Sequence, residues 1–161
     1  MGRVRYYEPE MAQTPRIYLD TCALNRLTDD QSQIRIRLEA EAIELFFVHL
    51  QTGKAAWITS SVLVAEIRRN QDVHYREDTL GMLFHASEFH LPNADVVDRA
   101  SLLNVLGYGK FDAFHLAIAE YAKVDLLLTT DDRFRRQAGR GLGNPLIRVA
   151  NPLDYVQEVK P

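Results

Sequence analysis

Short apolar runs alternate along the chain with longer stretches in which apolar residues recur every three or four positions. The short runs predict buried β-strands, and the longer pattern predicts amphipathic helices. Each predicted strand is followed by at least one predicted helix. The predicted strands cover residues 17–19, 56–59, 89–91, 124–129 and 147–149, and the predicted helices cover residues 31–51, 61–69, 73–86, 94–106, 110–122, 133–138 and a last segment that starts at Pro152.

The longest predicted helix, residues 31–51, has clear helical spacing of its apolar side chains. Thr28, Asp29 and Asp30 precede it and belong to the residue types that cap helix N-termini. Thr52 and Gly53 are expected to end it. The face that we expect to reach the core carries six residues at three- and four-residue steps: Ile34, Leu38, Ala42, Leu45, Phe46 and His49.

The alternation of strands and helices predicts the fold class. It is typical of a parallel sheet with helices on both faces. We therefore expect an α/β fold with three layers, α/β/α, around a central, mostly parallel sheet of about five strands. A length of 161 residues suits one domain. We expect residues 1–15 to form a flexible N-terminal tail and residues 16–161 to form a single domain.

Composition and charge narrow the class of protein. Hydrophobic residues make up 47% and charged residues 25%, which excludes intrinsic disorder. The one cysteine, Cys22, has no partner for an internal disulfide, so we expect a reducing, cytoplasmic location. No apolar run approaches the roughly 20 residues of a membrane span, and we expect neither a signal peptide nor a membrane partner. The net charge of −3 does not indicate a nucleic-acid-binding protein.

Acidic residues stand at positions where the predicted fold would bring them together. Asp20 follows the first strand, and Asp131 and Asp132 follow the 124–129 strand. Because ligands of parallel sheets bind at the carboxyl ends of the strands, these carboxylates are expected at one crevice. Glu66 and Asp112 lie within otherwise apolar helical segments.

Each of these carboxylates also has an ordinary structural interpretation. An Asp at a strand end commonly caps a turn or helix. Glu66 has Arg69 as a local ion-pair partner, and Asp112 has His115 three residues later on the same helix face. The joint pattern favours a site, because converging carboxylates repel one another and a divalent cation removes that penalty. A set of oxygen ligands selects Mg²⁺ or Mn²⁺, which support hydrolysis of phosphodiesters.

Four blocks of sequence resemble the PIN-domain ribonucleases. They are IYLDTCAL at residues 17–24, ITSSVLVAEI at residues 58–67, DAFHLAIA at residues 112–119 and LLTTDDRF at residues 127–134. No block is specific alone, but their order is that of the family. The resemblance extends over about residues 16 to 157, which is nearly the whole chain.

The resemblance implies a site, a cofactor and a reaction. It implies a catalytic and metal-binding quartet of Asp20, Glu66, Asp112 and Asp131, one or two Mg²⁺ or Mn²⁺ ions, and hydrolysis of RNA. Asp131 is favoured over Asp132 as the fourth ligand if Thr129 is the family's threonine. Many small members resemble VapC toxins, which implies an antitoxin partner and a homodimer. The long first helix and the acidic net charge depart from the commonest toxin pattern.

Other polar residues are expected to support this site. Thr21 and Thr129 are expected to hydrogen-bond the carboxylates and hold their rotamers. His115 is expected mainly to position Asp112, with contact to the scissile phosphate as the alternative. Arginine supplies 15 of the basic residues, and arginines near the acidic blocks are candidates for contacts with the RNA backbone, a solvated helix face being the alternative: Arg133, Arg135, Arg136 and Arg68.

Two other function classes stay open. A PIN-fold domain that binds RNA or protein without significant turnover would bind a metal yet cleave no RNA. A phosphatase of the haloacid dehalogenase type would need a second Asp two residues after the first, and Cys22 stands at that position. The endoribonuclease is therefore the favoured hypothesis, with the binding module as its alternative.

Overall fold

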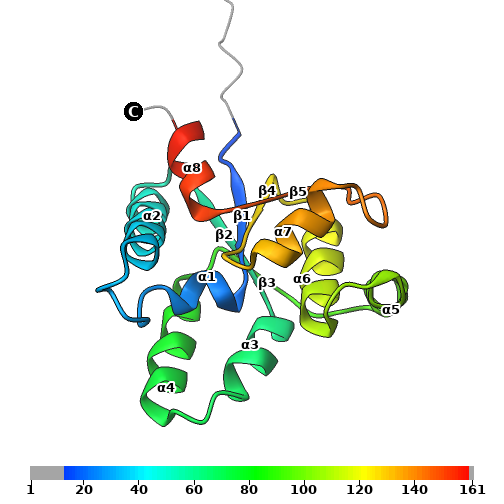
Figure 1. Ribbon diagram of the computed structural model, residues 1–161, viewed down its shortest axis with the longest axis horizontal. Helices are drawn as coiled ribbons and strands as arrows, with labels where there is room; N and C mark the ends of the chain where they lie inside the picture. Colours follow the sequence, from blue (N-terminus) through cyan, green and yellow to red (C-terminus); the bar gives the residue numbers. More distant parts are fainter. Residues whose placement is uncertain (1–12, 160–161) are drawn as a thin grey trace, which may run out of the picture.

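Five parallel strands form the central sheet, in the order β3-β2-β1-β4-β5 (Figure 1). The structure is a computed structural model and describes residues 13–159. The strands are β1 (Arg16–Leu19), β2 (Ala56–Ser60), β3 (Glu88–His90), β4 (Leu126–Leu128) and β5 (Arg148–Ala150). The predicted parallel five-stranded sheet is confirmed, and each observed strand overlaps a predicted one.

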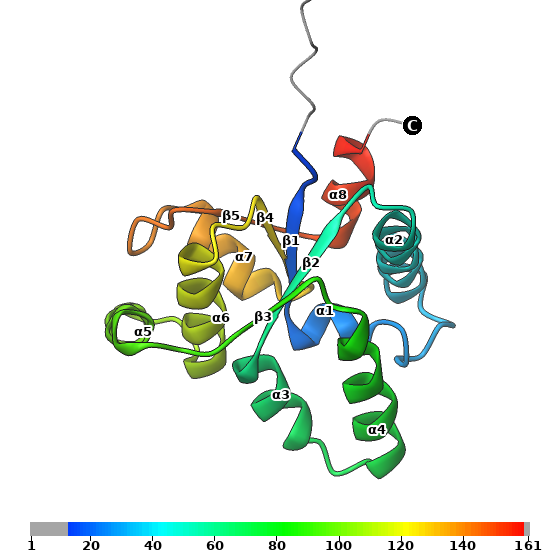
Figure 2. The same ribbon diagram turned by 180° about the vertical axis from the view of Figure 1, so that it is seen from behind.

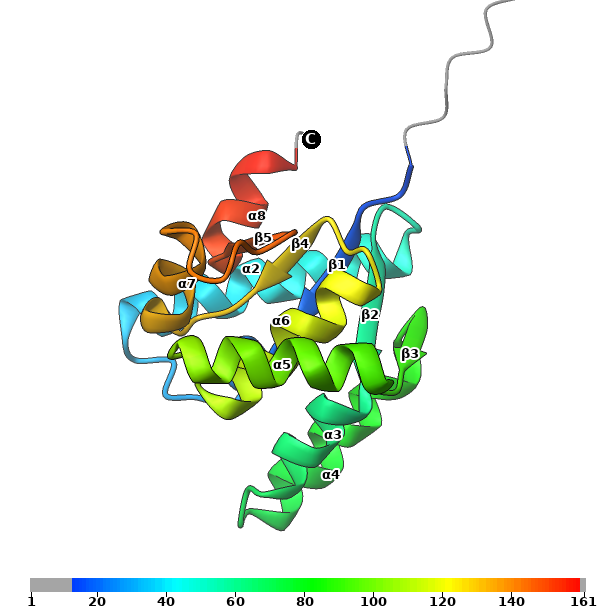
Figure 3. The ribbon, with the colours of Figure 1, turned by 90° about the vertical axis from the view of Figure 1, so that its right-hand side faces the viewer.

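Helices cover both faces of this sheet and complete the predicted three layers (Figures 1 and 2). They are α1 (Thr21–Asn25), α2 (Ile34–Gln51), α3 (Ser61–Arg68), α4 (Val73–Met82), the 3₁₀ helix η1 (Leu83–His85), α5 (Ala94–Leu106), α6 (Lys110–Tyr121), α7 (Asp132–Gly139) and α8 (Pro152–Glu158). Turned by a quarter (Figure 3), the molecule shows α5 and α6 in front of the strands and α2 behind them.

The central strand β1 separates two apolar cores. Tyr18 belongs to the core beneath α5 and α6, whereas Ile17 and Leu19 belong to the core beneath α2. This division follows from the alternation of side chains along a strand. All three side chains are at most 2% exposed, as expected for a strand buried on both faces.

The carboxyl end of a strand is repeatedly followed by a helix cap. Asp20 after β1, Ser60 as the last residue of β2, Asp131 after β4 and Asn151 after β5 each accept a backbone N–H of the next helix through the side chain. Such caps satisfy donors that the first helical turn leaves free. The loops at this edge are therefore short and fixed. Within residues 13–159, no helix has the length and apolar character needed to span a bilayer.

The structure corrects the prediction for the long helix. Helix α2 starts at Ile34, and Ile34 and Leu38 are 67% and 43% exposed rather than buried. The predicted Ala42 and Phe46 are buried, together with Glu39, Ala40 and Ile43, which were not predicted. The five-residue helix α1 was not predicted. Residues 1–12, most of the predicted tail, lie outside the described part of the chain.

Candidate active site

Asp20 lies at the junction of β1 and α1. Its Oδ1 accepts the backbone N–H of Ala23 at 2.8 Å, and its own N–H donates to the carbonyl of Leu128 at the end of β4, at 3.1 Å. The residue is 2% exposed. Burial raises the pKa of Asp20 to about 6, although His115, a hydrogen bond from Thr129 and the Ala23 N–H oppose this shift. The junction therefore holds in place a carboxyl group that burial makes harder to ionise.

Glu66 lies on α3 and is held at one oxygen by two side chains. The Thr21 hydroxyl donates to Oε2 at 2.7 Å, and Nε2 of His115 lies 2.6 Å from the same oxygen. Burial alone would raise the pKa of Glu66, but the hydrogen bonds from His115 and Thr21 hold it below its usual value. The predicted support from Thr21 is confirmed. The predicted pairing of His115 with Asp112 is wrong, since the ring instead hydrogen-bonds Glu66.

Asp112 lies in the first turn of α6, directly above the helix start at Gly109. A Cβ at position 109 would lie 3.2 Å from Oδ2 of Asp112, so the glycine leaves room for this carboxylate. Burial raises the pKa of Asp112 to about 7, and the nearby charges of Asp20 and Asp131 add to the rise. A carboxyl group with this environment is protonated in part near neutral pH unless a cation compensates it.

Asp131 and Asp132 are adjacent in sequence but point to different partners. Oδ1 of Asp131 caps α7 by accepting the N–H groups of Arg133 and Phe134, at 2.8 and 3.1 Å. The Asp132 carboxylate pairs with Arg35 of α2 at 2.8 and 2.9 Å. The charge of Asp131 raises the pKa of Asp112, whereas the charge of Asp132 is paired with Arg35. The geometry therefore favours Asp131 as the fourth carboxylate.

All four carboxylates lie near enough to Cys22 for their charges to affect its thiol. Burial raises the pKa of this thiol, and the further causes are the charges of Asp20, Glu66, Asp112 and Asp131. These residues come from the ends of β1 and β4 and from α3 and α6, which are far apart in sequence. The thiol is consequently held in its neutral form, which does not suit a nucleophile.

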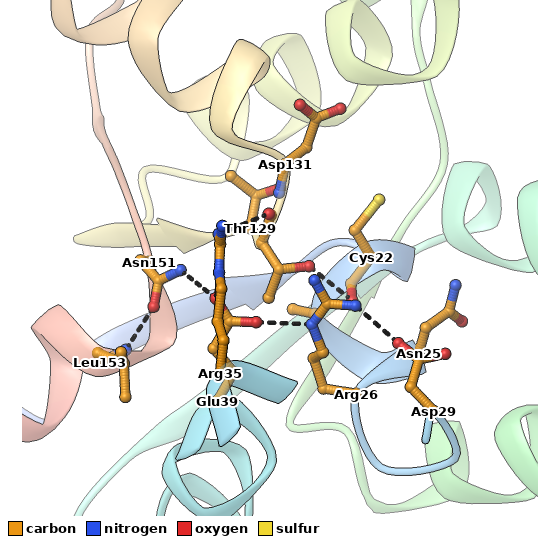
Figure 4. A network of polar contacts seen from close by, with 12 residues as sticks. Cys22, Asn25, Arg26, Asp29, Arg35, Glu39, Thr129, Asp131, Asn151 and Leu153 are labelled. Atoms are coloured by element: carbon orange, nitrogen blue, oxygen red, sulfur yellow. Dashed lines mark hydrogen bonds and ion pairs between the residues drawn. The ribbon is translucent and has the colours of Figure 1, made fainter. Parts of the chain in front are cut away.

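A buried ionic network supports this edge from the α2 side (Figure 4). The Glu39 side chain is fully buried and accepts hydrogen bonds from Arg26, Arg35 and Asn151, at 2.6, 2.9 and 2.7 Å. Figure 4 shows the Asp131 carboxylate pointing away from Glu39 and Arg35. The network thus links α1, α2 and the start of α8 without engaging Asp131. Sequence analysis did not identify Glu39 as a site-supporting residue, although its spacing from Ile43 places it on the buried helix face.

The remaining supporting residues occupy different positions. Thr129 accepts the Asp131 N–H at 3.1 Å and also hydrogen-bonds Asp20, so it contacts two neighbouring acidic residues. Arg133 and Arg136 are exposed on α7. Arg135 lies 3.3 Å from Asp132, with which it forms an ion pair.

Arg68 lies on the far side of α3 from this edge. With Val64, Leu83 and Phe84 it lines a hollow of about 680 Å³ between α3, η1 and β3. Arg69, its neighbour, places its guanidinium 5.3 Å from the ring centre of Phe111 and contributes to the low pKa of Glu66. The RNA-binding role of Arg68, like that of the α7 arginines, stays a prediction.

The acidic cluster is a candidate site for a divalent cation. Within residues 13–159, no group of three or more His, Cys, Asp or Glu side chains is arranged to hold a metal ion as it stands. The donor set nevertheless suits Mg²⁺ or Mn²⁺, because all four members are carboxylates. The hydrogen bonds found for Glu66 end on Oε2 and those for Asp131 on Oδ1, which leaves Oε1 and Oδ2 for a ligand.

Comparison with known proteins assigns the family. The PIN-domain family model matches residues 17–140, and the chain belongs to this family. No curated protein sequence gives a significant match to the chain. The family match supports a PIN nuclease, and it covers all four acidic residues.

Solved structures of toxin–antitoxin systems share the fold. VapC20 of Mycobacterium tuberculosis, described as a toxin that cleaves the sarcin–ricin loop, is 16% identical with a TM-score of 0.55 over 80% of this chain and 97% of that one. VapBC2 of Rickettsia felis, bound to promoter DNA, is 13% identical with a TM-score of 0.57 over 84% and 98%. FitAcB of Neisseria gonorrhoeae is 14% identical with a TM-score of 0.54 over 85% and 98%. At these identities the likeness establishes the fold.

Proposed function

We propose that this protein is a divalent-metal-dependent endoribonuclease in which Asp20, Glu66, Asp112 and Asp131 bind one or two Mg²⁺ or Mn²⁺ ions. The observation that carries the proposal is the environment of Asp112, a half-buried carboxyl group at the start of α6 whose pKa is raised by burial and by the nearby charges of Asp20, Asp131 and Glu66. A fold gains no stability from such mutual repulsion, whereas a cation site requires it. A bound divalent cation would polarise water and neutralise charge on a phosphodiester.

The chain's own residues orient this site. Asp20 and Asp131 are fixed because each also caps a helix. Glu66 is fixed by Thr21 and His115 at Oε2. The exposed Arg133 and Arg136 on α7 are placed to hold the RNA backbone beside the acidic edge.

The test is cleavage of a mixed RNA pool by the purified protein with Mg²⁺, with Mn²⁺ and with a chelator. The Asp20→Asn variant, purified in parallel, controls for contaminating nuclease. We expect cleavage that needs metal and is lost in the variant. Cleavage that survives in Asp20→Asn would remove this residue from the catalytic site.

We further propose that the protein is the toxin of a toxin–antitoxin pair and forms a homodimer in the cytoplasm. Support comes from the neighbouring structures, which include a VapBC complex and FitAcB. Exposed apolar side chains also support a protein partner: Leu102, Val105 and Leu106 on α5, and Phe84 on η1.

Induced expression should arrest growth of a bacterial host with the wild-type protein and not with Asp20→Asn. Light scattering after size exclusion should give twice the monomer mass.

A non-cleaving binding module is the second candidate. One observation favours it, namely that the described carboxylates are not already arranged as a metal site. Binding of Mn²⁺ without turnover on any RNA, together with retained RNA binding, would support this alternative over the nuclease.

A further inference from the structure

A chain of buried hydrogen bonds runs from the core to Glu66. The Ser60 hydroxyl lies 2.7 Å from the Tyr18 hydroxyl, which lies 2.7 Å from Nδ1 of His115. The opposite ring nitrogen, Nε2, lies 2.6 Å from Oε2 of Glu66. Ser60, Tyr18 and His115 are each at most 1% exposed. Solvent therefore does not compete for these hydrogen bonds.

The chemistry of the groups gives this chain one direction when the imidazole is neutral. The Glu66 carboxylate only accepts, so Nε2 of His115 must carry the proton. Nδ1 then accepts, and the Tyr18 hydroxyl must donate to it. The Tyr18 oxygen in turn accepts from Ser60, whose oxygen accepts the backbone N–H of Leu63 at 3.3 Å. Every donor in the chain thus points toward Glu66.

The two hydroxyls stand on rigid elements. Tyr18 is paired with Ile58 in the register of β1 and β2, and Ser60 lies two residues further on β2, on the same sheet face. Ser60 also caps α3, the helix that carries Glu66. The Tyr18 and His115 rings contact each other with centroids 5.5 Å apart. The neighbouring strands β1 and β2 therefore hold Tyr18 and Ser60 in place, and Ser60 also holds the start of the helix that carries Glu66.

We propose that Tyr18 and Ser60 are positioning residues that hold the His115 ring, in the Nε2–H tautomer that Glu66 requires, and so orient the Glu66 carboxylate with Oε1 as its metal-binding atom. Thr21 adds a second hydrogen bond to Oε2 and excludes the same oxygen from a ligand role. The consequence for cleavage rests on the proposed function, whereas the tautomer does not depend on it. Without the Tyr18 hydroxyl, Nδ1 of the buried imidazole loses its hydrogen-bond partner, and Glu66 alone holds the ring.

The first test is the tautomer of His115 in the metal-free wild-type protein. Long-range ¹H–¹⁵N spectra distinguish protonated from unprotonated ring nitrogens, and His115→Gln identifies the resonances. We expect a protonated Nε2 and an unprotonated Nδ1. The Nδ1–H tautomer or a doubly protonated ring in the wild type would overturn the proposal, and no variant has to fold for this result.

A matched pair of variants separates positioning from packing. In the opposite core, the hydroxyl of the buried Tyr155 lies 2.7 Å from Nδ1 of the half-buried His49, so the structure contains a second Tyr–His pair away from the acidic site. Tyr18→Phe and Tyr155→Phe each remove one hydroxyl from such a pair. We expect only Tyr18→Phe to weaken Mn²⁺ binding, by about 10-fold, as removal of a group behind a metal ligand typically does. Equal Mn²⁺ affinities in Tyr18→Phe and the wild type would overturn the proposal.

A rescue experiment examines the donor itself. His115→Leu removes the hydrogen bond to Glu66, whereas His115→Gln retains an N–H donor at nearly the same place. We expect Mn²⁺ affinity to fall about 10–100-fold in the leucine variant and to recover in part in the glutamine variant. Equal losses in both variants would mean that the ring only fills space.

Failure of this inference is distinguishable from failure of the proposed function. A wild-type protein that binds Mn²⁺ but cleaves no RNA, with affinity reduced by Tyr18→Phe, would support the positioning role and contradict the nuclease. Metal-dependent cleavage that is equal in the wild type, Tyr18→Phe and Tyr155→Phe would support the nuclease and overturn the positioning role.

Discussion

The Asp132 carboxylate forms a two-point ion pair with the Arg35 guanidinium, at 2.8 and 2.9 Å, and so joins α7 to α2. This pairing separates the roles of two adjacent aspartates. Asp132 holds two helices together, while Asp131 caps α7 through Oδ1 and contributes to the charge around Asp112. The two aspartates should therefore respond differently to substitution.

Asp131→Asn and Asp132→Asn should have opposite effects on activity and stability. Asp131→Asn should reduce cleavage strongly, because it removes a proposed metal ligand. Loss of a group that only supports a metal ligand typically costs about 10–100-fold, and we expect a larger loss here. Asp132→Asn should retain most activity and lose about 1 kcal/mol of stability or less, because its ion pair is partly exposed. Cleavage rates and urea unfolding of both variants check this. The reverse order of activities would place the fourth ligand at Asp132.

The metal-free protein should lose stability as the pH rises, and Asp112 should cause part of this loss. The pKa of Asp112 is about 7 in the folded state, above its ordinary value near 3.9. The folded state thus binds more protons between about pH 4 and pH 7, and its stability falls across that range. Asp112→Asn removes the titrating group and should therefore have the higher Tm at pH 8 in chelator. The difference between the two proteins should shrink at pH 5. A variant less stable than the wild type at both pH values would contradict this account.

Mg²⁺ or Mn²⁺ should raise the Tm of the wild-type protein. A ligand that binds only the folded state stabilises it by about 2.7 kcal/mol at a concentration of 100 times its Kd. For a chain of this size each kcal/mol corresponds to a Tm shift of about 2–4 °C. Asp20→Asn should show a much smaller shift, since it lacks one ligand and one negative charge. An equal shift in both proteins at millimolar metal would indicate binding elsewhere.

Glu39→Gln should destabilise the protein without changing the acidic site directly. The substitution replaces a buried carboxylate that accepts from Arg26, Arg35 and Asn151, and charge-assisted hydrogen bonds of this kind contribute about 2 kcal/mol. Glu41→Gln is the matched control, because Glu41 is exposed on the same helix. Urea unfolding at pH 7 should separate the two variants. Equal midpoints would mean that the network contributes no net stability.

The Glu39 effect should depend on pH in a defined direction. Burial alone would raise the pKa of Glu39, but its hydrogen bonds from Asn151, Arg35 and Arg26 lower it below the ordinary value. A lowered pKa contributes stability above the unfolded-state pKa, near 4.3, and that contribution is lost as the pH falls through the folded-state pKa. The gap between the wild type and Glu39→Gln should therefore narrow below about pH 4.

Sequence patterns predicted the sheet well because its strands are short apolar runs that end at polar caps. They also predicted that Asp20 and Asp131 follow neighbouring strand ends, because parallel topology brings such ends together, whereas the metal-binding role of the acidic residues stays a prediction. The face of α2 was predicted wrongly in its first turns, where Ile34 and Leu38 are exposed and the acidic Glu39 is buried. Glu39 is buried because Arg26 balances its charge and Asn151, 112 residues away, donates a hydrogen bond to it. Such compensation depends on tertiary contacts that periodicity does not contain.

The partner of His115 illustrates the same limit. Helical spacing placed Asp112 three residues away, and a local partner was the simplest expectation. The observed partner, Glu66, is separated from it by 49 residues and reaches the ring from another helix. The roles of Tyr18 and Ser60 also depend on the neighbouring positions of β1 and β2. These contacts follow from the sheet register rather than from any sequence motif.

Asp20 and Asp131 each cap a helix and each belong to the proposed acidic site. Replacing one carboxylate oxygen by an amide nitrogen would therefore affect catalysis without affecting folding. Asparagine caps helices about as well as aspartate, whereas alanine costs about 1 kcal/mol at such a position. An Asp-to-Asn change at either residue should therefore silence the proposed site yet preserve the junctions after β1 and β4. A descendant protein with asparagine at either position would keep the fold, and selection could then favour binding over cleavage. Abundance in the cell would then be a poor guide to whether such a descendant is still an enzyme.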